Sequence, residues 1–169
     1  MLPTTERGRQ MRARLLAAAR EVFERDGFLA ARVTDIAAAA GVAHGSFYTY
    51  FGSKTEVFRA LVAATMDELY ASLGTDASAG SSPRASSPAE AVARIDRANR
   101  RFVAMYRSNT ALMALFEQVT TFDPEVRALR QAARERMVGR VRRSIEHLQA
   151  DGLVDAEVDA EYGAHALVS

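Results

Sequence analysis

The sequence contains no cysteine among its 169 residues. This absence excludes a disulfide scaffold, a thiolate metal site and a cysteine nucleophile. Four prolines and ten glycines are too few for a collagen-like or low-complexity chain. No apolar run approaches the ~20 residues of a membrane-spanning helix, and the start of the chain lacks the apolar segment of a secretory signal. We therefore expect a cytoplasmic protein with no membrane segment.

Lysine is also scarce, because Lys54 is the single lysine of the chain. The 22 basic and 21 acidic side chains give a net charge of +1. Residues 1–60 hold nine basic and six acidic residues, so the excess of positive charge lies at the N-terminal end. That asymmetry favours a nucleic-acid partner there. The early arginines either follow a DNA backbone or keep a flexible end solvated; they are Arg7, Arg9, Arg12 and Arg14.

Helix-forming residues dominate and alternating strand patterns are nearly absent, which predicts an all-α fold. A first helix is expected from about Arg9 to Asp26, ended by Gly27. Thr34 is expected to cap a short helix that ends at Gly41. Further short and long helices are expected over about 44–51 and about 54–73, the latter begun by a capping box at Ser53 and Glu56.

Residues 74–88 are rich in Gly, Ser, Ala and Pro and predict a linker between two helical regions. Helices restart at Ser87-Pro88 and at Asp123-Pro124, where Ser and Asp serve as caps. A last helix is expected from about Asp155, and no stop follows before Ser169. The chain is thus expected to be shorter than the natural one or to be completed by a partner, with a frayed end as the alternative.

Residues 34–54 form the most informative segment, because two short helices joined at Gly41-Val42-Ala43 predict a helix-turn-helix. Phe47 and Phe51 are four residues apart and are expected to pack inward. The remaining face carries no acidic residue, as a surface laid against phosphates and base edges requires. It is formed by His44, Gly45, Ser46, Tyr48, Thr49 and Tyr50.

This pattern resembles the DNA-binding signature of the tetracycline-repressor (TetR/AcrR) family, through Ile36-Ala37, Gly41-Val42, Phe47-Tyr48, Tyr50-Phe51 and Ser53-Lys54. The resemblance implies a three-helix DNA-binding domain over 9–69, with its helix-turn-helix at about 32–51. It implies a helical-bundle domain for ligand binding and dimerisation over 70–169, incomplete at its C-terminal end. It also implies a homodimeric repressor that binds a pseudo-palindromic double-stranded operator and is released by a small effector.

The resemblance further assigns DNA contacts residue by residue. Tyr48 corresponds to a phosphate-contacting tyrosine, Thr34 is expected near phosphate, and Lys54 adds charge to a helix start. The expected DNA-contacting residues are Thr34, His44, Gly45, Ser46, Tyr48, Tyr50 and Lys54. Ala43 departs from the family's usual capping Ser or Thr, and His44 is uncommon at its position. The operator sequence therefore cannot be carried over.

The second region offers bulky apolar residues that could line an effector pocket, although such residues are more often packed core. The candidates are Phe102, Met105, Tyr106, Asn109, Met113, Phe116, Met137 and Val141. They favour a hydrophobic or amphipathic effector. The alternative is a DNA-binding module controlled by a protein partner, with no small-molecule pocket.

Catalytic motifs are missing from the sequence, which has no phosphate-binding glycine loop, nucleophile elbow or zinc-protease motif. We therefore expect no enzymatic activity, no catalytic residue and no cofactor. The three histidines, His44, His147 and His165, lack metal-ligand spacing, so no metal site is expected.

Overall fold

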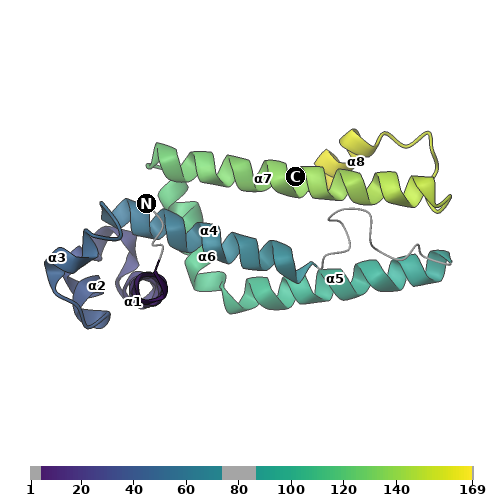
Figure 1. The fold of residues 1–169 in the computed structure, drawn as a ribbon. Coiled ribbons are helices and arrows are strands. Elements are labelled where there is room, and N and C mark those ends of the chain that lie inside the picture. Colours follow the sequence, from purple (N-terminus) through teal and green to yellow (C-terminus); the bar gives the residue numbers. More distant parts are fainter. Residues whose placement is uncertain (1–4, 74–86, 169) are drawn as a thin grey trace. The chain divides into compact units, whose positions relative to one another are not determined.

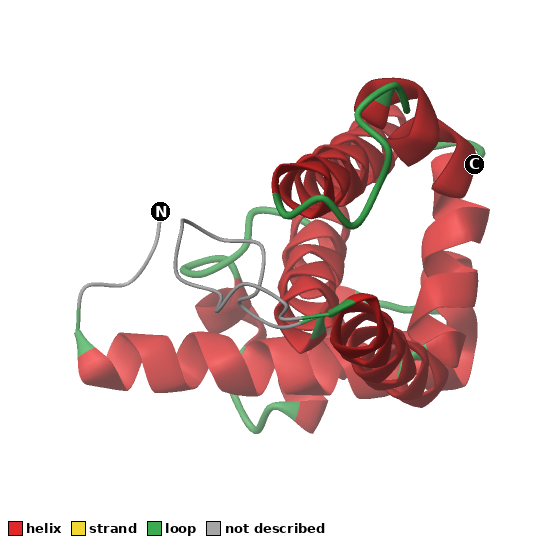
Figure 2. Cartoon of the chain, turned by 90° about the vertical axis from the view of Figure 1, so that its right-hand side faces the viewer, coloured by secondary structure: helices red, strands yellow, loops and turns green. Residues whose placement is uncertain are grey.

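The computed structural model describes residues 5–73 and 87–168, and within those ranges every regular element is a helix (Figure 1). This confirms the all-α prediction, and the described segments between the helices are loops and turns (Figure 2). The helices are α1 Glu6–Ala30, α2 Val33–Ala39, α3 His44–Phe47, α4 Lys54–Ser72, α5 Pro88–Ser108, α6 Thr110–Thr120, α7 Pro124–Ala150 and α8 Ala160–Leu167. Most of the predicted linker, and Ser169 at the chain end, lie outside the described residues.

The first of two compact units contains the described residues up to Thr65 together with Asn109–Arg127. Within it α1 contacts α2 and α6, and α2 contacts α3. Its core holds a cluster of phenylalanine rings, in which Phe58 meets Phe23 and Phe28 edge-on at centroid distances of 5.2 and 4.9 Å. Phe116 of α6 is buried in the same unit. A segment far along the sequence therefore contributes to the core of the unit that holds the predicted DNA-binding helices.

Helix boundaries in this unit follow local signals, with one correction. Gly27 has a φ of 76° and a ψ of 163°, so it interrupts α1 where the sequence predicted a stop. Gly41, with a φ of 66°, follows the end of α2, a backbone conformation that favours glycine. The prediction that Thr34 caps α2 is wrong. Arg32 in extended conformation precedes the first turn, which places Thr34 inside the helix.

Side-chain caps begin several other helices as predicted. The Ser53 hydroxyl accepts a hydrogen bond from the Glu56 backbone N–H at 3.0 Å. The Glu56 carboxylate in turn accepts from the Gly52 N–H at 2.7 Å, one residue before the position of an ordinary capping box. Asp123 accepts from Glu125 and Val126 at the start of α7. Each cap satisfies amides that the helix leaves without a partner.

The second compact unit contains the described residues of Met66–Ser108 and Ala128–Ser169. In it Tyr70 of α4 donates a hydrogen bond to the Ala133 carbonyl of α7. Arg136 pairs with Asp67 at 2.8 Å and lies over the Tyr70 ring at 4.9 Å. The last helix begins at Ala160 with Asp159 as its cap, five residues later than the expected start. The contacts of Tyr70 and Arg136 tie α4 to α7.

Candidate nucleic-acid interface

The α2–α3 segment presents a short exposed helix on a buried support. Ala43 precedes α3 in an extended conformation and provides no side-chain cap, as the sequence indicated. Phe47 and Phe51 are 0% and 2% exposed, and their rings lie 5.8 Å apart. Regular helix ends at Phe47 and a turn covers residues 48–50, so α3 is shorter than the expected 44–51. The two buried rings fix which face of this segment points outward.

The outward face carries the residues that the sequence assigned to DNA. His44, Gly45, Ser46 and Tyr48 are exposed, whereas Tyr50 is half-buried. Tyr48 is 51% exposed, and its ring lies edge-on to the His44 ring at 5.3 Å. It also meets the buried Phe47 ring at 5.4 Å. Tyr48 is thereby held against two rings while part of its surface remains available to a partner.

Gly45 stands at the centre of this face, and internal packing does not require a glycine there. A Cβ added at Gly45 would meet nothing within 4 Å, and its φ does not lie in the left-handed region. A helical glycine is less stable than alanine by about 0.5–1 kcal/mol. The protein therefore carries a small destabilisation at an exposed position, which is consistent with the close approach of another molecule.

Thr34 is exposed on α2, and its hydroxyl lies 3.4 Å from the Asp35 carboxylate. The phosphate contact expected of Thr34 stays a prediction. Thr34 does not cap α2, so the cap no longer supports that contact. Asp35 also adds negative charge beside the site where a phosphate would approach.

Lys54 has a different environment from the one expected. Its Nζ donates to the carbonyl oxygens of Phe28, Leu29 and Ala31 at 2.7, 3.2 and 2.9 Å. It also lies 4.8 Å from the centre of the Phe28 ring. An ammonium group has three protons to donate, and its three acceptors lie in residues 28–31, the end of α1 and the residue after it, which we call the α1–α2 connection. Burial lowers the pKa of Lys54 below its ordinary value.

The early arginines lie within α1 rather than in an extended arm, and three of them have partners inside the first unit. Arg9 pairs with Glu6 at 2.6 Å. Arg12 lies over the Phe51 ring at 5.0 Å, and Arg14 donates to the Ala40 carbonyl at the end of α2 at 2.6 Å. Sequence reasoning missed the roles of Arg12 and Arg14, because their partners lie 39 and 26 residues away. No local pattern reports such contacts.

The predicted effector-pocket residues are divided between the two units. Asn109, Met113 and Phe116 are buried in the first, whereas the other five belong to the second. Among the latter, Tyr106 is 43% exposed. Their role in binding an effector stays a prediction.

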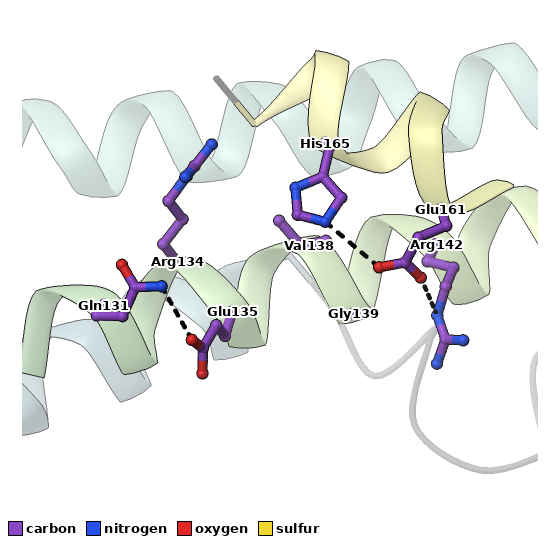
Figure 3. A pocket seen from close by; sticks show the side chains of 8 residues that line it. All are labelled: Gln131, Arg134, Glu135, Val138, Gly139, Arg142, Glu161 and His165. Carbon is purple, nitrogen blue, oxygen red and sulfur yellow. Dashed lines mark hydrogen bonds and ion pairs between the residues drawn. The ribbon is translucent and has the colours of Figure 1, made fainter. Parts of the chain in front are cut away.

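A pocket of about 380 Å³ within the second unit lies between α7 and α8 and contains none of these candidates (Figure 3). There the Glu161 carboxylate lies 3.4 Å from Arg142 Nε and 3.3 Å from His165 Nε2. Gln131 donates to Glu135 on the same helix. Charged and polar side chains thus line most of this pocket, unlike the apolar cavity that the sequence suggested.

Within 5–73 and 87–168, no three histidine or acidic side chains are grouped to hold a metal ion. In the same ranges, no helix has the length and apolar character needed to cross a membrane.

Comparisons with known proteins agree with this geometry. The family described as "Bacterial regulatory proteins, tetR family" matches residues 15–61, which include α2, α3 and the start of α4. The uncharacterised HTH-type transcriptional regulator YfiR of Bacillus subtilis (strain 168) is 35% identical over 65 residues. That match covers 38% of this chain and 32% of YfiR, so it spans about a third of the relative's length.

Solved structures share the fold over most of the chain. A TetR-family regulator from Syntrophomonas wolfei has a TM-score of 0.72 at 19% identity, covering 94% of this chain and 78% of that one. A TetR/AcrR-family regulator from Thermobifida fusca has a TM-score of 0.68 at 26% identity, covering 94% and 80%. The family match, the shared fold and the helix-turn-helix geometry agree. Residues 15–61 thus match the tetR family of bacterial regulatory proteins, and solved structures described as TetR-family regulators share the fold along most of the chain.

Proposed function

We propose that this protein represses transcription by binding a pseudo-palindromic operator as a homodimer, and that a small hydrophobic or amphipathic effector releases it. The observation that carries the proposal is the outward face of the α2–α3 segment. That face has no acidic side chain on α3 and is fixed in place by Phe47 and Phe51. A regulator that reads chromosomal DNA works in the cytoplasm.

In the proposed complex, α3 enters the major groove and its first residues approach base edges, as recognition helices do. His44 and Ser46 supply side chains that donate and accept hydrogen bonds. Tyr48 and Thr34 contact backbone phosphates, and Tyr50 supports the same face. Two copies of α3 in a dimer then meet half-sites about 34–36 Å apart.

Residues 9–69 are proposed to contact DNA, and residues 70–169 to bind the effector and the second subunit. An effector releases DNA only if it binds two conformations with different affinity. Contacts inside the first unit support a route for such a change. Phe122, which follows α6, meets the Phe28 ring at 6.0 Å, and α6 itself contacts α1. A displacement of α6 would therefore reach the helices that hold α3.

The DNA-binding proposal is tested by Gly45→Ala, with Gly139→Ala on α7 as the matched control. Neither added methyl group meets a close internal neighbour, because the nearest atom to a Cβ at Gly139 lies 3.5 Å away. Both variants should fold at least as stably as the wild type. A methyl group forced into a packed interface costs about 1–3 kcal/mol. Gly45→Ala should therefore weaken operator affinity by about five- to 150-fold.

Binding is measured by fluorescence anisotropy on duplexes selected from a random pool. Gly139→Ala should retain wild-type affinity. Equal affinity of all three proteins would show that α3 does not approach DNA closely. His44→Ala and Ser46→Ala should change sequence preference, whereas Tyr48→Phe should weaken binding to every sequence alike.

Control by a protein partner remains the second candidate. The observation in its favour is that α5 exposes apolar side chains, with Val92 65%, Ile95 45% and Val103 46% exposed. Native mass spectrometry of protein purified from its own host separates the two candidates. A dimer that carries a bound small molecule supports the effector, whereas a dimer that retains a second polypeptide supports the partner.

A further inference from the structure

A second pocket lies in the first unit, beside the outward face of α3. It has a volume of about 350 Å³ and is open to solvent. One wall comes from the first turns of α1, including Arg7 and Met11. The other comes from Ser46, Thr49 and Tyr50. The pocket therefore borders the surface that we propose to meet DNA.

Arg7 differs from the other three early arginines. Arg9, Arg12 and Arg14 are engaged by Glu6, the Phe51 ring and the Ala40 carbonyl respectively. Within residues 5–73 and 87–168, the structure gives the Arg7 guanidinium no hydrogen bond and no ion pair, and its side chain is exposed. Its five N–H donors thus remain available to a ligand that reaches the pocket.

The chemistry of the lining favours a phosphate. No carboxylate lines this pocket, and the nearby Glu6 carboxylate already accepts from Arg9 and Gln10. A guanidinium binds phosphate oxygens through two parallel hydrogen bonds. The Thr49 and Tyr50 side chains add hydroxyl groups, which commonly contact the DNA backbone.

We propose that this pocket binds a backbone phosphate of DNA, with Arg7 as the charged anchor and Thr49 as a neighbouring donor. The inference rests on the proposed function and extends it, because α1 then contacts DNA directly in addition to supporting α3. One phosphate, held outside the base edges, fixes the position of α3 along the groove. Arg7 thus contributes to affinity for all sequences and not to the choice among them.

The test compares Arg7→Gln with Arg9→Gln. The second variant removes the same charge two residues later on α1, from an arginine that is already paired with Glu6. Affinity is measured on a selected operator and on a random-sequence duplex between ~50 and ~200 mM salt. Each neutralised phosphate contributes about 0.9 to the slope of log affinity against log salt. Arg7→Gln should reduce that slope by ~1 on both duplexes, whereas Arg9→Gln should leave it unchanged.

Two further variants separate charge from shape. Arg7→Lys keeps the charge, so it should retain the wild-type slope of log affinity against log salt. It should still bind more weakly than the wild type, because lysine cannot make the bidentate contact to phosphate. Thr49→Val removes only a hydroxyl and should weaken binding severalfold without a change in slope. Circular dichroism melting checks that each variant folds, which exposed positions should permit.

Methylphosphonate scanning then locates the phosphate. Neutralising phosphates one at a time should reveal one position to which the wild type is sensitive and Arg7→Gln is not. Equal slopes for Arg7→Gln and Arg9→Gln, or the absence of such a position, would overturn the inference while leaving DNA binding intact. Inorganic phosphate can compete with DNA for this pocket. The inference is also overturned if Arg7→Gln changes only this competition and leaves the affinity for DNA itself unchanged. Failure of the wild type to bind any duplex would instead refute the proposed function.

Discussion

Replacing Lys54 should destabilise the protein through the α1–α2 connection and leave the electrostatics of DNA binding unchanged. Its ammonium donates to three carbonyl oxygens and lies against the Phe28 ring. Lys54→Met keeps the aliphatic stem but removes the donors. Those carbonyls then depend on water, which the half-buried position only partly admits.

The magnitude follows from the hydrogen bonds. A hydrogen bond to a charged group contributes about 1.5–3 kcal/mol, and three around one atom do not add in full. Water also replaces part of the loss, so we expect Lys54→Met to cost about 2–4 kcal/mol. For a chain of this size, each kcal/mol lowers Tm by about 2–4 °C. A loss of about 3 kcal/mol, the middle of the expected 2–4 kcal/mol, should therefore lower Tm by about 6–12 °C.

Thermal and urea unfolding measure the effect, with Arg100→Gln as a control. Arg100 pairs with Asp96 on an exposed face, and such pairs contribute little, so its loss should leave Tm nearly unchanged. The salt dependence of DNA binding supplies the second readout, and Lys54→Met should retain the wild-type slope. A variant with wild-type Tm and a slope reduced by ~1 would refute this reasoning and restore Lys54 to the phosphate contacts.

Two other substitutions probe α1 and α4. Gly27→Ala should lower the free energy of unfolding in urea by about 1–3 kcal/mol, because the φ of 76° and ψ of 163° at Gly27 suit glycine almost exclusively. The new Cβ would meet no atom within 4 Å, so the loss would come from the backbone conformation alone. Unchanged stability would show that the backbone relaxes freely. Burial raises the pKa of Tyr70 above its ordinary 10.0. The stability that the protonated Tyr70 hydroxyl contributes is therefore complete below about pH 10 and is lost as pH rises through the folded-state pKa. The free energy of unfolding of the wild type should therefore fall more steeply above about pH 10 than that of Tyr70→Phe, and parallel pH profiles would contradict this assignment.

Local features of this fold could be predicted from the sequence because their causes are local. The caps at Ser53 and Asp123 and the stop at Gly41 each involve residues a few positions apart. The inward packing of Phe47 and Phe51 likewise follows from helical spacing. The outward face of α3 could therefore be assigned before its structure was known.

Long-range contacts could not be predicted in the same way. Lys54 binds carbonyls 23 to 26 residues earlier, and Arg14 binds a carbonyl 26 residues later. Thr34 was a good cap by residue type, but the extended conformation of Arg32 starts α2 earlier. The burial of Phe116 on α6, a helix that contacts α1, depends on segments far apart in the sequence. The contacts of Lys54 and Arg14 are decided by tertiary packing, which residue type and spacing do not encode.

Because the sequence holds no other lysine, the Nζ of Lys54 is its one side-chain amine. An acylating reagent can reach this nitrogen only when its hydrogen bonds to the α1–α2 connection open. The rate of acylation at Lys54 therefore measures the frequency of that local opening, in a protein with no engineered label. Comparing that rate with and without bound DNA would report whether operator binding rigidifies the support of α3.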